Sequence, residues 1–139
     1  IRFNERIQIN GRPIPNNDLA QVLRAVQDIY AQGEPPTFFE CATAMALYYF
    51  AVKQVDWAVV ETGMGGRYDA TNVVEPEVSV ISNISMEHQL YLGNTLAKIA
   101  REKAGIIKPG SAAIIGETRP ELVSIFRDAG AAMQAVATP

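Results

Sequence analysis

The sequence predicts an α/β protein, in which helices flank a sheet of mostly parallel strands. Two short apolar runs rich in β-branched residues, at positions 55–60 and 78–84, have the composition of buried strands. Apolar residues at helical spacing precede the first run and follow the second. Further strands are expected at 112–115 and 131–136, around a helix at 119–129. From position 17 onward the order is helix, helix, strand, strand, helix, strand, helix, strand, which is typical of α/β layers.

Composition favours one ordinary globular domain. The chain has 139 residues, of which 48% are hydrophobic and 19% charged, enough for a single core. A net charge of −3 without a densely basic stretch argues against nucleic-acid binding. The single cysteine, Cys41, has no partner for an internal disulfide, and no secretory signal or membrane-spanning run is visible. We therefore expect a soluble cytoplasmic protein that binds neither nucleic acid nor membranes.

The first part of the sequence predicts a hairpin and two helices. Asn10-Gly11 is a strong turn pair between short apolar stretches, which indicates a β-hairpin. Apolar residues recur at helical spacing from position 17 to position 30, and a connector with glycine and proline follows. Thr37 and Glu40 have the spacing of a capping box, so a second helix is expected to begin there.

The segment VDWAVVETGMGGRYDATNV, at positions 55–73, organises the rest of the prediction. Its apolar run is expected to be a strand covered on both faces, which ends at Glu61 before a glycine-rich loop. Ligands of open α/β sheets bind at the carboxyl ends of the strands, where Glu61 would lie. A strand that simply ends at a polar residue before a turn is an equally good interpretation. The loop does not match the Walker A phosphate-binding pattern.

Polar side chains of the glycine-rich loop are candidates for orienting a substrate. Arg67, Asp69 and Asn72 follow its glycines and offer charged and amide groups. A tight turn held by its own hydrogen bonds uses the same residue types, so both interpretations stay open.

The only histidine, His88, lies just beyond the second apolar run. Neighbouring parallel strands present their carboxyl ends at one edge of the sheet, so His88 and Glu61 are expected to approach one another if their strands are neighbours. Both side chains can bind a metal ion. A solvated or capping histidine is the alternative.

Lys103 falls on the buried stripe of the next helix, for which Asn94 is the expected N-cap. It follows Ile99 and Ala100 at helical spacing. A lysine that faces the core is costly unless it is paired or uncharged, which makes Lys103 a candidate for function. The ordinary alternative is a packed stem whose ammonium reaches solvent.

Several segments together resemble folylpolyglutamate synthase, a family with bifunctional dihydrofolate synthase members that belongs to the Mur ligase superfamily. They are RFNERI at 2–7, TFFE at 37–40, the segment at 55–73, VSVISNIS followed by His88 and LGNT, and IAREKAGIIKPG at 99–110. The resemblance implies a P-loop NTPase or Rossmann-like Mur ligase central domain. Positions 1–139 would be an internal piece of that ATP-binding domain, truncated at both ends. The phosphate-binding loop is expected upstream, and a carboxy-terminal domain for glutamate and ATP downstream.

The resemblance implies an ATP-dependent ligase of folate and one-carbon metabolism. ATP phosphorylates a substrate carboxylate, and the amine of L-glutamate attacks the acyl phosphate to extend folate or dihydropteroate by an amide bond. The resemblance assigns Glu61 and His88 to Mg²⁺, and Lys103 to the lysine that reacts with carbon dioxide to form a metal-binding carbamate. The expected partners are ATP, L-glutamate and folate or dihydropteroate, and the parent protein is expected to be monomeric. This chain alone is expected to be inactive.

One residue departs from the family pattern. Glu87 stands where the family commonly has Asp before the histidine, although either carboxylate can orient an imidazole. Imidazole is also a softer ligand than Mg²⁺ prefers. Two alternatives stay open: a non-catalytic Rossmann-like ligand-binding module in which Glu61, His88 and Lys103 are structural, and a sibling Mur ligase that acts on a cell-wall precursor. The RFNERI and DATNV segments disfavour the latter.

Overall fold

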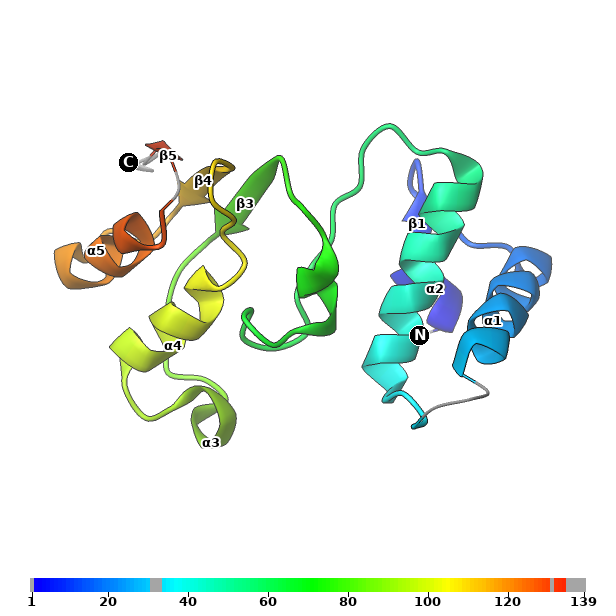
Figure 1. Cartoon of the computed structure of the whole chain (residues 1–139), viewed down its shortest axis with the longest axis horizontal. Helices are drawn as coiled ribbons and strands as arrows, with labels where there is room; N and C mark the ends of the chain where they lie inside the picture. Colours follow the sequence, from blue (N-terminus) through cyan, green and yellow to red (C-terminus); the bar gives the residue numbers. More distant parts are fainter. Residues whose placement is uncertain (1, 31–33, 131, 135–139) are drawn as a thin grey trace. The chain divides into compact units, whose positions relative to one another are not determined.

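The computed structural model describes residues 2–30, 34–130 and 132–134. The chain divides into two compact units, Ile1–Val60 and Glu61–Pro139, which are considered separately (Figure 1). Among the described residues, no helix combines the length and the apolar character needed to cross a membrane.

The first unit pairs a hairpin with two helices. Its elements are the 3-10 helix η1 (Phe3–Arg6), the strands β1 (Gln8–Ile9) and β2 (Arg12–Pro13), and the helices α1 (Asn16–Tyr30) and α2 (Phe38–Lys53). The predicted hairpin is confirmed, because β1 and β2 pair antiparallel and both turn residues, Asn10 and Gly11, have positive φ angles of 52° and 72°. The predicted capping box is also confirmed: the Glu40 N–H donates to Thr37 Oγ1 at 3.3 Å, and the Thr37 N–H donates to the Glu40 carboxylate at 2.7 Å.

A small apolar core and one polar cluster join the elements of the first unit. The buried residues of this core come from the hairpin and from facing sides of the two helices: Ile7, Ile14, Val22, Val26, Met45 and Tyr49. At the edge of the core the Tyr49 hydroxyl donates to Asp18 at 3.1 Å, and Lys53 forms an ion pair with the same carboxylate at 2.9 Å. The hydrogen bond and charge of Lys53, with the Tyr49 hydroxyl, hold the pKa of Asp18 below its ordinary value.

The strand predicted at 55–60 is wrong. This segment has no strand pairing in the structure, and Trp57 and Val59 are 77% and 98% exposed. The segment begins directly after α2, where the Val55 N–H donates to the Phe50 carbonyl at 3.2 Å. The apolar pattern reports a preference for extended backbone and burial, but a strand also needs a hydrogen-bonding partner, and none of the described strands provides one.

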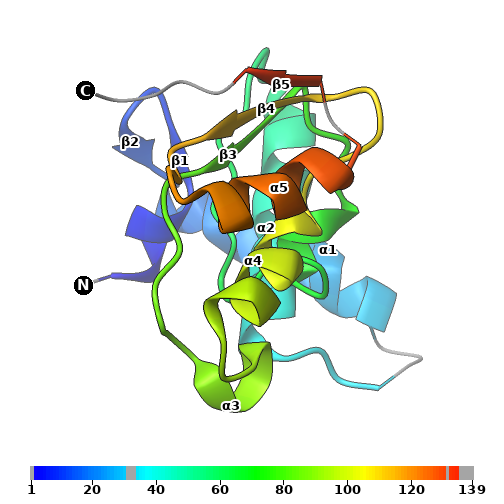
Figure 2. The same ribbon diagram turned by 90° about the vertical axis from the view of Figure 1, so that its left-hand side faces the viewer.

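The second unit is a parallel three-stranded sheet with helical crossovers. The strands β3 (Val78–Ile81), β4 (Ala112–Ile115) and β5 (Ala132–Gln134) pair in the order β3-β4-β5, with Val78 opposite Ala112 and Ala112 opposite Ala132. The helices α4 (Leu96–Ala104) and α5 (Pro120–Asp128) connect them and lie on the same side of the sheet (Figures 1 and 2). The α/β prediction with a parallel sheet and flanking helices is therefore confirmed.

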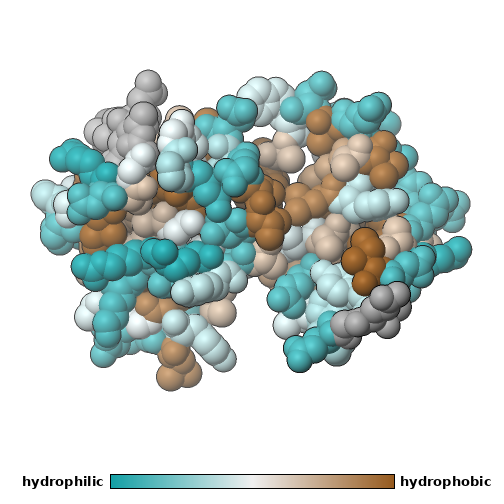
Figure 3. Space-filling view, viewed as in Figure 1, coloured by the Kyte–Doolittle hydropathy of each residue, from teal (hydrophilic) through white to brown (hydrophobic). Residues whose placement is uncertain are grey.

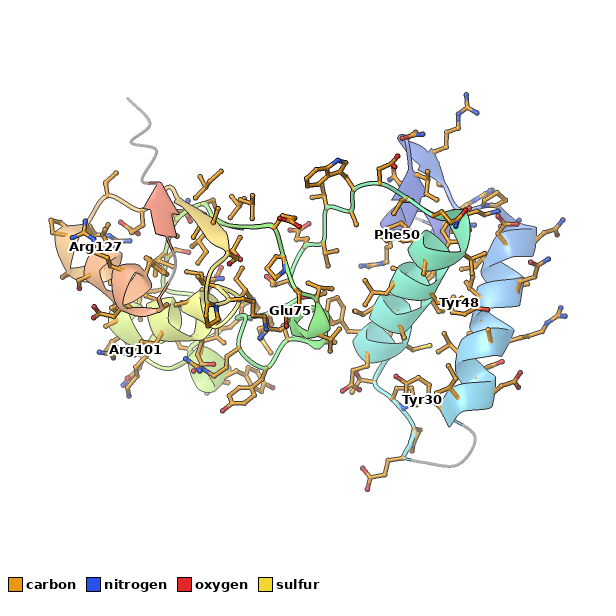
Figure 4. All side chains as sticks on the ribbon, turned by 45° about the horizontal axis from the view of Figure 1, so that its top comes forward. Tyr30, Tyr48, Phe50, Glu75, Arg101 and Arg127 are labelled. Carbon is orange, nitrogen blue, oxygen red and sulfur yellow. The ribbon has the colours of Figure 1, made fainter. Side chains whose placement is uncertain are left out.

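The core of the second unit lies between the sheet and these helices. Alternate residues of β3 and β4 are buried against them, which is the two-residue period of a strand with one covered face. The largest buried side chains are Phe126, Ile99 and Leu122. The outer surface of α4 is hydrophilic (Figure 3), and Arg101 of α4 and Arg127 of α5 are exposed on the solvent side (Figure 4).

Several boundaries differ from the predicted ones. The second apolar run, predicted as a strand to position 84, is a strand only to Ile81. A short helix, α3 (Gln89–Leu92), comes later in the chain, and the sequence pattern did not predict it. Thr95, not Asn94, caps α4, because its hydroxyl accepts the Lys98 N–H at 3.2 Å. The part of the predicted 131–136 strand beyond β5 lies outside the described residues.

Candidate functional site

The glycine-rich loop is folded around the carboxylate of Asp69. One carboxylate oxygen accepts the N–H groups of Gly63 and Met64, each at 2.9 Å. The other oxygen accepts the N–H and the hydroxyl of Thr71, at 3.0 and 2.5 Å, and caps the 3-10 helix η2 (Ala70–Val73). Asp69 thus fixes the path of the backbone from Gly63 to Thr71.

The same loop is fastened to the last turn of α4. The Arg67 N–H donates to the Glu102 carbonyl at 2.9 Å, and the Arg67 side chain forms a longer ion pair with the Glu102 carboxylate at 3.7 Å. The Asn72 amide donates to the carbonyls of Arg67 and Gly105 at 2.9 and 3.1 Å. Lys108 adds a hydrogen bond from its ammonium to the Asn72 carbonyl at 3.0 Å.

Two glycines make this close contact possible. A Cβ atom on Gly66 would lie 2.8 Å from the Glu102 carbonyl oxygen and 3.0 Å from that of Lys103. A Cβ atom on Gly105 would lie 2.6 Å from the Arg67 Cα. Backbone therefore packs directly on backbone, which only glycine permits at these positions.

Arg67, Asp69 and Asn72 all take part in these structural contacts. The hydrogen bonds support the interpretation of a turn held by its own polar groups, which the sequence left open. A role of these residues in orienting a substrate stays a prediction.

Lys103 points inward and is paired. Its side chain is 21% exposed, and its ammonium lies 2.7 Å from a carboxylate oxygen of Glu87. The hydrogen bond and the charge of Lys103 are the main causes that hold the pKa of Glu87 below its ordinary value, and the nearby His88 adds to them. The pair satisfies the condition that an inward-facing lysine needs a partner.

His88 has an unusual backbone conformation. Its φ and ψ angles of 46° and 39° lie in the left-handed region, which few residues other than glycine adopt, and its side chain is exposed. The conformation starts α3, because the His88 carbonyl accepts the N–H groups of Tyr91 and Leu92 at 2.9 Å each. Such backbone strain is more frequent at functional sites than elsewhere. Since Glu87 precedes His88, the ion pair ties Lys103 to the segment that carries the histidine.

Glu61 is exposed and opens the glycine-rich loop that is fastened to α4. In the part of the chain that the structure describes, no three His, Cys, Asp or Glu side chains are grouped so that they could hold a metal ion. A metal bound here would therefore need further oxygen ligands.

Sequence reasoning missed one buried charged group, Glu117. Its side chain is 4% exposed, and its carboxylate accepts the Nε–H of Arg119 at 2.8 Å and an Nη2–H of the same guanidinium at 2.6 Å. The N–H groups of Ile84, Thr118 and Arg119 also donate to it, at 3.0 to 3.1 Å. The Arg119 side chain is the main cause that lowers the pKa of Glu117 to about 2, and these backbone N–H groups add to it. A Glu-x-Arg spacing just beyond the predicted strand at 112–115 was the available signal.

Acid is expected to destabilise the second unit through Glu117. Because the folded-state pKa of about 2 lies below the ordinary value of 4.5, the stabilisation is complete above pH 4.5 and is lost as the pH falls toward 2. Urea unfolding over this range should show that the wild type loses on the order of 2 kcal/mol more stability than a Glu117→Gln variant. Glu121→Gln, which removes an exposed acid of α5, should keep the pH dependence of the wild type. Equal slopes for the wild type and Glu117→Gln would contradict the prediction.

Comparison with known proteins identifies the family to which this parallel βαβαβ fold belongs. Residues 19–135 match the Mur ligase middle domain, and the chain belongs to that family.

Its relatives within that family include folate enzymes, as the sequence resemblance implied. The dihydrofolate synthase/folylpolyglutamate synthase of Bacillus subtilis is 44% identical over 136 residues, which cover 91% of this chain and 31% of the relative. The structure of E. coli FolC in complex with DHPP and ADP has a TM-score of 0.89 at 32% identity, over 97% of this chain and 33% of that one. An FPGS-AMPPCP-folate complex has a TM-score of 0.87 at 39% identity, over 96% and 35%. The chain thus spans about a third of the length of these relatives.

Proposed function

We propose that this chain is part of a longer ATP-dependent ligase that adds L-glutamate to folate or dihydropteroate through an acyl phosphate. The family membership and the ligands of the similar structures, ADP with DHPP and AMPPCP with folate, support this class of reaction. The observation in this structure that supports it best is the inward-facing Lys103. Its ammonium is paired with Glu87, the residue that precedes His88, and its helix is the one to which the loop after Glu61 is fastened.

Glu61, His88 and Lys103 are proposed to bind Mg²⁺. The fit rests on the chemistry of the donors: Glu61 offers an exposed carboxylate, and a carbamate on Lys103 would offer oxygen atoms, which Mg²⁺ prefers. His88 is a weaker match in ligand type. When bound, the ion supplies positive charge that offsets the negative charge of phosphate groups. Because the described side chains provide no complete ligand set, water and nucleotide oxygens are proposed to fill the remaining positions.

Carbamylation of Lys103 would change its relation to Glu87. The Lys103 ammonium first loses a proton to solvent. The neutral amine then adds to the carbon of CO2: an N–C bond forms, one C–O π bond breaks and leaves its electron pair on oxygen, and a second nitrogen proton passes to solvent. The cation that now pairs with Glu87 at 2.7 Å becomes an anion, so the attraction becomes a repulsion. We propose that Glu87 then turns toward solvent, which its partly exposed position permits.

The proposed function is tested with the full-length protein. ADP release is measured with ATP, Mg²⁺ and L-glutamate and with either dihydropteroate or a folate monoglutamate as the acceptor. We expect ADP release that requires both L-glutamate and a pterin acceptor, and the better acceptor identifies the physiological reaction. A nucleotide-linked peptide is the third acceptor. Turnover with this peptide alone would identify a sibling Mur ligase, and no turnover with any of the three acceptors would favour the non-catalytic binding module.

A further inference from the structure

Glu117 and Arg119 together hold both backbone polar groups of one buried residue, Ile84. The Ile84 N–H donates to the Glu117 carboxylate at 3.1 Å, and the Ile84 carbonyl accepts from Arg119 Nη2 at 2.5 Å. Ile84 itself is 3% exposed and packs in the core of the second unit. Beyond the end of β3, the backbone groups of Ile84 thus bond to the side chains of Glu117 and Arg119 instead of to a neighbouring strand.

Glu117 and Arg119 form a clamp on Ile84, and this clamp is rigid for a chemical reason. A guanidinium and a carboxylate that share two parallel hydrogen bonds have a fixed mutual orientation. The remaining capacity of the carboxylate is used by the Thr118 and Arg119 N–H groups, which fix it to its own backbone. The Glu117 side chain is buried, whereas the Arg119 side chain is 39% exposed. Compared with apolar residues of the same volume, such an ion pair contributes little net stability, so its main effect is to fix geometry.

The segment that this clamp holds leads directly to the candidate site. Residues 82–88 form neither helix nor strand, and Glu87 and His88 stand at their end. Gly116 adds a second close contact, because its N–H donates to the Ile81 carbonyl at 2.8 Å. Between these anchors near β3 and the Glu87–Lys103 ion pair, the segment has no regular hydrogen-bond ladder of its own, so its path depends on its two ends.

We propose that Glu117 and Arg119 are positioning residues of the ligase, which hold Ile84 and thereby set the path of the segment that carries Glu87 and His88. This inference rests on the proposed function for its link to Mg²⁺, but its structural part stands on the contacts alone. Neither side chain touches substrate or metal in this scheme.

The test uses the full-length protein and Mn²⁺ as a paramagnetic substitute for Mg²⁺. The imidazole NMR signal of His88 is assigned by its absence from a His88→Ala variant, and its broadening is followed during a Mn²⁺ titration. Glu117→Gln keeps the shape of the side chain but removes its charge, and Arg119→Lys keeps the charge but not the fork. Two controls are Glu121→Gln, an exposed acid in the first turn of α5, and Asp18→Asn, which breaks the ion pair with Lys53 in the first unit.

We expect both test variants to raise the Mn²⁺ concentration for half-maximal broadening about 10-fold or more, as for other residues that orient metal ligands. Both controls should match the wild type, although Asp18→Asn also lowers stability. Folded test variants with an unchanged titration and an unchanged His88 signal would overturn the inference.

Failure of the proposed function gives a different result. If Mn²⁺ does not broaden the His88 signal of the wild type, the metal assignment is wrong. The positioning inference is then decided by the metal-free spectra, in which Glu117→Gln and Arg119→Lys, but neither control, must shift the His88 signal.

Discussion

Replacing Lys103 with alanine is expected to lower the proposed ligase activity of the full-length protein about 100-fold or more, a loss typical for removal of a group that organises charge stabilisation. The variant loses the amine that is paired with Glu87, and with it the proposed carbamate. The measurement is glutamate-dependent ADP release at saturating ATP and Mg²⁺. Short carboxylic acids added to the assay are expected to restore part of the activity, because a free carboxylate can occupy the space of the carbamate.

Lys98→Ala is the matched control for this experiment. Lys98 belongs to the same helix but is exposed, and its ammonium donates to Asn94 at 3.3 Å. Its removal changes net charge and helix composition as Lys103→Ala does, so it is expected to keep nearly full activity. Normal turnover by Lys103→Ala without added carboxylates would remove Lys103 from the mechanism. If the variant is folded but inactive and no carboxylate rescues it, the carbamate is rejected. Loss of the ion pair with Glu87 then explains the loss of activity.

The elements that the sequence predicted correctly are those whose signal is local. The Thr37–Glu40 capping box and the Asn10-Gly11 turn each depend on residues within one turn of chain, and both are as predicted. Helix α4 shows the same for periodicity, because Ile99 and Ala100 are fully buried. The segment at 55–60 shows the limit, because its pattern matched a buried strand while the pairing partner is a non-local property.

In the candidate site, too, the local features were predictable from the sequence and the non-local ones were not. The inward direction of Lys103 follows from helical spacing and was predictable, whereas its partner Glu87 comes from a loop beyond another strand. The left-handed backbone of His88 has no sequence signal, since the residue is not a glycine. Glu117 was missed because burial of an acid depends on Arg119 and on the backbone of Ile84, which only the sheet brings near.

Gly105→Ala is expected to destabilise the second unit and to release the glycine-rich loop from α4. Gly105 has φ and ψ angles of −62° and −12°, at which alanine is favoured over glycine by roughly 1 kcal/mol in a helix. Local preference therefore predicts stabilisation. The new Cβ atom, however, would lie 2.5 Å from the Arg67 Cβ and 2.6 Å from its Cα, and backbone cannot turn away as a flexible side chain can. We expect a net loss of about 1–3 kcal/mol in urea unfolding, the usual cost of overpacking.

Gly110→Ala is the control that separates the close contact between Gly105 and Arg67 from the effect of backbone strain. Its φ angle is 82°, and a Cβ atom there would meet nothing within 4 Å, so alanine should cost about 1 kcal/mol without affecting the loop. Hydrogen exchange of the Arg67 N–H, which donates to Glu102, should accelerate in Gly105→Ala and not in Gly110→Ala. If Gly105→Ala is instead more stable than the wild type and protects the Arg67 N–H equally, the loop and α4 do not depend on each other. The linkage of Glu61 to the helix of Lys103 would then have no structural basis.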